Sequence, residues 1–159
     1  MALGRWRSNF KSEADGLQRG DTWNLEFDSS INPRRPQPGW KEYITQTSAR
    51  FSCSLCGKRW SSNNVMVVFH MHRKGRTGTV KVRRFGQKCQ KCSNAPMEDP
   101  SINKTNICTL MRNLVKKIKN NCYNAALQGR EYPYNKLVVT SRHKPAHCEG
   151  CIQGICTKN

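Results

Sequence analysis

Two pairs of cysteines give this sequence its clearest chemical signal. Cys53-Ser-Leu-Cys56 and Cys89-Gln-Lys-Cys92 each hold two thiols three positions apart, and 32 residues separate the pairs. Cysteines at this spacing can turn around one ion on a tight knuckle, and two knuckles supply the four thiolates of a tetrahedral zinc site. Because redox motifs and turns also use a single CxxC, it is the pairing that favours zinc over disulfides or free thiols.

A third pair, Cys148-Glu-Gly-Cys151, is followed by Cys156 and predicts a second zinc site. A knuckle with two flanking ligands can surround one ion within about fifteen residues. For the fourth ligand we favour His143, five positions before Cys148, and keep His70 as the alternative. We therefore expect two Zn²⁺ ions in structural sites.

We do not expect an enzyme. The zinc-deaminase signature H-x-E…P-C-x-x-C is missing from the sequence. A four-thiolate site is closed, whereas a catalytic zinc keeps an open coordination position. Carboxylates are also scarce near the predicted ligands, so few groups could act as a general base.

The elements that would position these ligands are short. Residues 65–85 predict a β-hairpin, with turn residues at 74–78. Aromatic and apolar residues at helical spacing predict a short amphipathic helix over 40–50, which leads to the first knuckle. Apolar residues at three- and four-residue steps predict a long helix from about 105 to 126. Alternation predicts a strand at 21–27, and residues 136–140 are a second strand-like segment.

These elements indicate a small α+β, zinc-stabilised domain, in which an antiparallel hairpin sheet and zinc knuckles accompany one long amphipathic helix. We expect residues 1–20 to be a flexible basic N-terminal arm, 21–156 to form a single domain, and 157–159 to be a tail. The apolar content of 36% and the mean hydropathy of -0.79 are low for a chain that builds its own core. Metal ions would make up for that shortage.

Location follows from the same composition. The first residues lack the apolar run of a signal peptide, so we expect a cytoplasmic protein with reduced thiols. No stretch approaches about 18 apolar residues, so we do not expect the chain to span a membrane.

Positive charge is concentrated in the middle of the chain. The net charge is +18, and residues 43–97 contain eleven Lys or Arg but no Asp or Glu. Such a field attracts nucleic acid, an anionic membrane face or an acidic protein segment. The candidate nucleic-acid contacts are the basic residues of the hairpin, of the second knuckle and of the long helix: Arg73, Lys74, Arg76, Lys81, Arg83, Arg84, Lys88, Lys91, Lys116 and Lys117.

The motif set resembles the receptor-transporting protein family, whose domain is the three-CxxC zinc finger. The resemblance covers about residues 20–156. It is carried by the segments Trp40-Lys-Glu-Tyr43, Phe51-Ser-Cys-Ser-Leu-Cys56, Arg84-Phe-Gly-Gln-Lys-Cys-Gln-Lys-Cys92 and Cys148-Glu-Gly-Cys-Ile-Gln-Gly-Ile-Cys156, together with Trp60, residues 65–70 and His143. By matching positions, it implies metal binding by the seven cysteines of the two predicted sites and by His143.

The resemblance implies two activities. An interferon-induced branch of the family acts in innate antiviral defence and binds RNA. We expect this chain to be such an RNA-binding domain, with single-stranded or structured RNA, viral RNA included, as its partner. The alternative is an adaptor that helps receptors with seven transmembrane helices reach the cell surface. Family members typically end in a hydrophobic anchor, whereas this chain stops three residues after Cys156, so we expect no membrane anchor in it.

Overall fold

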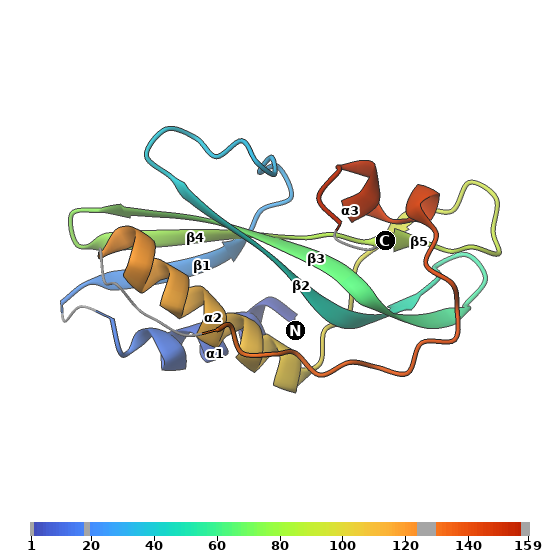
Figure 1. Cartoon of the computed structure of the whole chain (residues 1–159), viewed down its shortest axis with the longest axis horizontal. Helices are drawn as coiled ribbons and strands as arrows, with labels where there is room; N and C mark the ends of the chain where they lie inside the picture. Colours follow the sequence, from blue (N-terminus) through green and yellow to red (C-terminus); the bar gives the residue numbers. More distant parts are fainter. Residues whose placement is uncertain (1, 18–19, 124–129, 157–159) are drawn as a thin grey trace. The chain divides into compact units, whose positions relative to one another are not determined.

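The computed structural model describes residues 2–17, 20–123 and 130–156, and it confirms the α+β class. The strands are β1 (Thr22–Phe27), β2 (Lys41–Ser52), β3 (Arg59–Lys74), β4 (Thr77–Arg84), β5 (Gln87–Lys88) and β6 (Met97–Glu98) (Figure 1). The helices are α1 (Ala2–Ala14), α2 (Lys104–Cys122), the short 3-10 turn η1 (Pro145–His147) and α3 (Glu149–Ile152).

The strands form two sheets. The larger has the order β1-β4-β3-β2, with β1 parallel to β4 and Leu25 opposite Val80. The predicted hairpin corresponds to β3 and β4, which Gly75 joins at a positive φ of 61°. Strands β5 and β6 form a separate antiparallel pair in which Gln87 lies opposite Glu98.

The chain divides into two compact units whose segments alternate along the sequence, whereas the sequence predicts one domain over 21–156. The first unit consists of Met1–Ile44, Val68–Arg83 and Lys104–Tyr134, and the second of Thr45–Val67, Arg84–Asn103 and Asn135–Asn159. The predicted tail, 157–159, lies outside the described residues.

Apolar packing builds the first unit. Helix α2 buries Ile107, Leu110, Met111, Leu114, Val115 and Ile118, the face that its periodicity predicts. Its described part ends at Cys122, and residues 124–126 of the prediction lie outside the described residues. Helix α1 packs against α2 and β1.

The N-terminal arm is a correction to the sequence analysis. Residues 2–14 form helix α1 and are not a flexible arm, because Trp6 and Phe10 lie one helical turn apart and are 1% and 2% exposed. The Trp6 ring meets that of Phe27 edge-on, with the ring centroids 5.4 Å apart. Two large side chains on an otherwise polar segment are therefore enough to fix the helix.

Two further predictions of secondary structure are wrong. Residues 41–52 form strand β2 and not a helix, since Thr47, Ala49 and Phe51 are buried at two-residue steps. Residues 136–140 contain no strand.

In the second unit, Phe51 stacks on Trp60 with 5.3 Å between ring centroids. Trp60 in turn packs against the buried cluster of Cys53, Cys89 and Ala95. Cysteines of the first predicted zinc site are therefore part of the core of this unit.

Replacing Trp6 by Ala should lower the free energy of unfolding by about 3–5 kcal/mol, because a buried indole leaves a cavity that its neighbours cannot fill. Urea unfolding of the zinc-loaded protein measures this. Arg5→Ala, an exposed change in the same helix, is the matched control and should stay near the wild-type value. Equal stability of both variants would contradict the packing of α1.

Candidate metal centres

The first knuckle lies between strands β2 and β3. Cys53 follows β2 directly, and its N–H donates to the Lys58 carbonyl at 2.8 Å while its own carbonyl accepts from Gly57 N–H at 3.0 Å. Gly57 has a φ of +76°, a conformation that glycine adopts without steric cost. Glu98 holds the knuckle from β6, since one carboxylate oxygen accepts from both the N–H and the hydroxyl of Ser54 at 2.8 Å.

The four thiols of this first centre fit a zinc ion. The Sγ atoms of Cys53 and Cys92 are 3.8 Å apart, as are those of Cys56 and Cys89, and all four lie within 4.8 Å of one another. Four sulfurs bound at about 2.3 Å around a tetrahedral ion would be separated by about 3.8 Å. The backbone N–H groups of Leu55 and Cys56 point at the Cys53 sulfur, at 3.3 and 3.4 Å, and would stabilise its thiolate.

The two thiols of the second knuckle, Cys89 and Cys92, differ in pKa. The pKa of Cys89 falls to about 7: burial opposes ionisation, but hydrogen bonds from the N–H groups of Lys91 and Cys92 and from the Cys53 and Cys56 thiols together outweigh it. Its neighbour behaves oppositely, because hydrogen bonding to the Cys56 sulfur, together with burial, raises the pKa of Cys92 to about 12. Metal binding needs thiolates, so loading this centre at neutral pH must release protons.

The second centre is assembled within the last described residues. Cys148 caps the N-terminus of α3, where its sulfur accepts from Cys151 N–H at 3.3 Å. The Nε2 atom of His143 lies 3.3 Å from the Cys151 sulfur and 3.9 Å from that of Cys156. A nitrogen and a sulfur on one tetrahedral zinc would be separated by about 3.6 Å, so this set also fits the ion.

One short segment connects the two centres. Gln87 forms a β-bridge to Cys148 on one side and pairs with Glu98 on the other. Its side chain accepts from Trp60 Nε1 at 2.9 Å and donates to Ser62 at 2.9 Å. Because Cys89 is two residues further along, Gln87 links the ligands of both centres.

Glu149 strengthens this connection. Its carboxylate accepts from Gly86 N–H at 2.8 Å, and its own N–H donates to the Gly86 carbonyl at 3.0 Å. A side chain at Gly150 would also collide with Met66, since a Cβ there would lie 2.9 Å from the Met66 Cγ. Sequence reasoning missed Gln87, Glu98 and Glu149, because no spacing rule connects them with the cysteines.

The structure thus brings the eight predicted ligands together in two groups of four. The alternative ligand, His70, belongs to neither group, and its Nε2 atom lies 2.7 Å from a carboxylate oxygen of Glu42 in the first unit. The zinc-binding assignment of the domain therefore rests on two separate four-ligand clusters.

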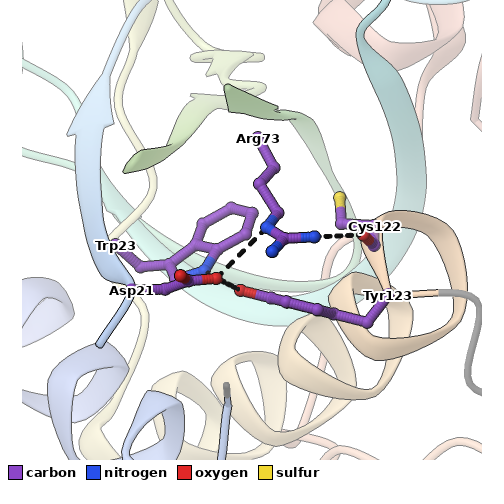
Figure 2. A network of polar contacts seen from close by, with 5 residues as sticks. All are labelled: Asp21, Trp23, Arg73, Cys122 and Tyr123. Carbon is purple, nitrogen blue, oxygen red and sulfur yellow. Dashed lines mark hydrogen bonds and ion pairs between the residues drawn. The ribbon is translucent and has the colours of Figure 1, made fainter. Parts of the chain in front are cut away.

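Several predicted nucleic-acid contacts are instead engaged by other residues of the chain, and Arg73 is the clearest case (Figure 2). Its Nε donates to Asp21 at 3.1 Å, its Nη1 donates to the Cys122 carbonyl at 3.4 Å, and its guanidinium covers the Tyr123 ring. Asp21 also accepts from the Tyr123 hydroxyl, which in turn accepts from Trp23 Nε1 at 2.9 Å.

Most of the other predicted contacts also have internal partners. Arg83 donates to the Ile31 carbonyl at 2.9 Å, and Lys81 lies 3.5 Å from Asp28. Three more have partners: Arg84 contacts the Pro100 carbonyl, Lys116 the Arg130 carbonyl and Lys117 the Tyr43 ring. Burial lowers the pKa of Arg84, and Asp99 opposes that shift.

Four predicted contacts remain. Lys74, Arg76 and Lys91 are exposed, and Lys88 is half-buried. Most of the candidate nucleic-acid contacts are therefore structural, and those that are fully exposed lie at the β3–β4 turn and on the second knuckle.

A family model and the most similar curated proteins indicate the same family for this chain. Residues 46–154 match the model of a family described as a zinc-binding domain, the three-CxxC zinc ribbon. The chain is 35% identical to mouse receptor-transporting protein 2, an alignment that covers 94% of this chain and 69% of the relative. Identity to mouse receptor-transporting protein 3 is 33%, over 98% of this chain and 34% of the relative.

A third relative, human receptor-transporting protein 4, is 31% identical over 95% of this chain and 63% of its own length. The chain thus spans between about one third and two thirds of these three proteins. No solved structure matches it. Within the described ranges, no helix has both the length and the apolar character needed to cross a bilayer.

Replacing Cys148 by Ser should reduce the zinc content from two ions per chain to one, because three ligands hold the second ion much less tightly than four. Native mass spectrometry counts the ions directly. Cys108→Ser is the matched control, since Cys108 lies on α2 and belongs to neither ligand group. Two ions retained by the Cys148 variant would contradict the ligand set.

Proposed function

Because the chain belongs to the receptor-transporting protein family, we propose that it acts in receptor transport, as a zinc-stabilised adaptor. The observation that carries this proposal is identity of 31–35% to receptor-transporting proteins 1 to 4 over 92–98% of the chain. The partner we propose is a receptor with seven transmembrane helices, contacted in the cytoplasm.

The arrangement of the ligands supports a binding role over a catalytic one. Each group offers four ligands, so an ion in either would have the closed shell of a structural site, with no position left for substrate. The short elements around the ligands, such as β5, β6 and α3, gain their order from that ion. We therefore propose that zinc shapes the surface that meets the partner, and that the chain is not an enzyme.

Co-expression with an epitope-tagged seven-helix receptor should raise the amount of receptor at the cell surface, measured by flow cytometry on intact cells. Cys53→Ser/Cys89→Ser should abolish the rise, because it removes two ligands of the first centre. Cys108→Ser should preserve it. If the wild-type chain gives no rise, even with a membrane anchor attached, the adaptor function is wrong.

RNA binding in innate antiviral defence is the second candidate, and the charge distribution favours it. The stretch 43–97 has no acidic residue, and three of its exposed cations, Lys74, Arg76 and Lys91, are among those singled out above. Single-stranded nucleic acid is bound by positive grooves with aromatic platforms. The aromatic side chains of this stretch offer little platform, however, because Trp60 is half-buried and the other four are buried: Tyr43, Phe51, Phe69 and Phe85. The proposal therefore depends on charge.

RNA affinity should fall with salt at a slope of roughly −0.7 per phosphate contact, measured by fluorescence anisotropy with a single-stranded oligoribonucleotide. Lys74→Glu/Arg76→Glu should abolish binding, since both side chains are exposed at the β3–β4 turn. Lys11→Glu/Lys104→Glu, which reverses two exposed charges on α1 and α2, is the charge-matched control and should bind as the wild type does. Arg83 and Arg84 are unsuitable, because their replacement breaks contacts to the Ile31 and Pro100 carbonyls. Unchanged affinity in the double variant would contradict this candidate.

A further inference from the structure

Residues 130–140, which we call the strap, run without helix or strand and are held by two asparagines. In the first unit, Asn113 of α2 donates to the Tyr132 carbonyl at 2.9 Å and accepts from Tyr132 N–H at 2.7 Å. In the second unit, Asn63 of β3 does the same for Leu137, at 3.0 and 2.8 Å. Each side-chain amide thus exchanges with one strap residue the two bonds that a neighbouring strand would supply.

The Asn63 side chain is itself held in place by a third hydrogen bond. The Oδ1 atom of Asn63 accepts from the Ser48 hydroxyl at 2.6 Å, so the amide is oriented from β2 as well as bound by the strap. Leu137 is therefore held as a strand residue would be, although its partner is a side chain. In an extended segment, the N–H and C=O groups of the residues on either side point the opposite way.

The strap around Leu137 has the character of an edge strand. Val138 is 87% exposed, whereas Val139 is 39% exposed and lines a cavity, which is the alternation of an extended segment. Valine and threonine, the types at 138–140, favour strands. In the described ranges, the hydrogen bonds of residues 136–140 are the two of Leu137 with Asn63. The outward edge at Lys136 and Val138 therefore offers backbone groups to a partner.

A cavity of about 510 Å³ lies beside this edge, within the second unit. Its wall combines the Trp60 ring with neutral hydroxyl and amide side chains, including Ser62, Asn64 and Gln90, and Arg142 stands among them. No Asp or Glu lines it. The cavity can thus hold a neutral or aromatic side chain of a partner, while Arg142 attracts a carboxylate of the same partner.

Charge narrows the choice of occupant. The sequence has no acidic residue between Glu131 and Glu149, while Lys136, Arg142 and Lys144 are exposed. A second copy of this chain would bring the same positive charge, with +18 overall, to the same edge. RNA has no peptide backbone to pair with a strand edge. An acidic peptide satisfies both the charge and the free backbone groups.

We propose that the outward edge of residues 136–140 accepts an extended, acidic segment of a partner protein as an added β-strand, with one partner side chain entering the adjacent cavity. Peptides bind in this way to other exposed strand edges, where main-chain bonds give affinity and side-chain pockets give selectivity. The inference deepens the adaptor function proposed above and rests on it for the identity of the partner.

The test uses the zinc-loaded full chain and a fluorescein-labelled heptapeptide of alternating Glu and Val, followed by anisotropy. A peptide with Lys in place of Glu is its control. Val138→Pro removes the outward N–H but leaves the bonds of Leu137 intact, whereas Val138→Thr keeps the N–H and the β-branched side chain. The acidic peptide should bind the wild type and the Thr variant within about twofold of each other, and the Pro variant about tenfold more weakly, the size of one backbone hydrogen bond.

Hydrogen exchange on the wild type gives a second readout that needs no variant. The amide hydrogens of Lys136 and Val138 should become protected when the acidic peptide is present. The proposal is overturned if neither amide is protected, if the Pro variant binds as well as the wild type, or if the Lys peptide binds equally. The proposal is also overturned if an oligoribonucleotide, and not the acidic peptide, protects these amides. It fails likewise if sedimentation shows that the wild type is a dimer through this edge and that the Pro variant is a monomer.

The cell-surface receptor assay distinguishes failure of this inference from failure of the adaptor function. If Val138→Pro delivers receptor as well as the wild type, the strap is not the contact, and the adaptor function stands. If the wild type delivers no receptor but its strap edge binds the acidic peptide, the adaptor function fails and the binding surface stands.

Discussion

Sulfur ligation of zinc is the interaction on which the second unit depends. Its helices and strands outside β2 and β3 are two to four residues long, far below the length at which such elements persist alone. Cys53 and Cys89 are themselves buried and form a cluster with Ala95, so ligands of the first centre are part of its core. The first unit is built differently, because α1 and α2 supply large apolar faces. One chain thus combines two means of stabilisation, metal ligation and hydrophobic burial.

The two metal centres are not independent pieces of this architecture. Gln87 lies between Cys148 and Glu98 in the backbone ladder, and Glu149 and Gly86 exchange hydrogen bonds beside it. Order in one centre therefore favours order in the other, because the same segment must be extended for both. The arrangement also explains why residues so far apart in the sequence as 53 and 156 belong to one compact unit.

The ligands could be predicted because thiols three positions apart have few other uses in such numbers, and α2 because its apolar residues repeat with the helical period. What failed depended on distant partners. Helix α1 buries just two of its side chains, Trp6 and Phe10. Residues 41–52 form a strand because β3 pairs with β2, although Trp40, Tyr43 and Ile44 have helical spacing. The internal partners of Arg73 and Arg83 could not be predicted, because they come from residues 21 and 31, about fifty positions away.

The network around Asp21 has an evolutionary consequence. Its carboxylate is 2% exposed and depends on Arg73 and on the Tyr123 hydroxyl, so the loss of either partner leaves a buried negative charge poorly compensated. Drift at any one of these three positions is therefore constrained by the other two, and they should change together across lineages. Lys74 and Arg76, next to this network but exposed, are free to diverge. Related chains can accordingly alter the charge of the β3–β4 turn while inheriting the arginine beside it.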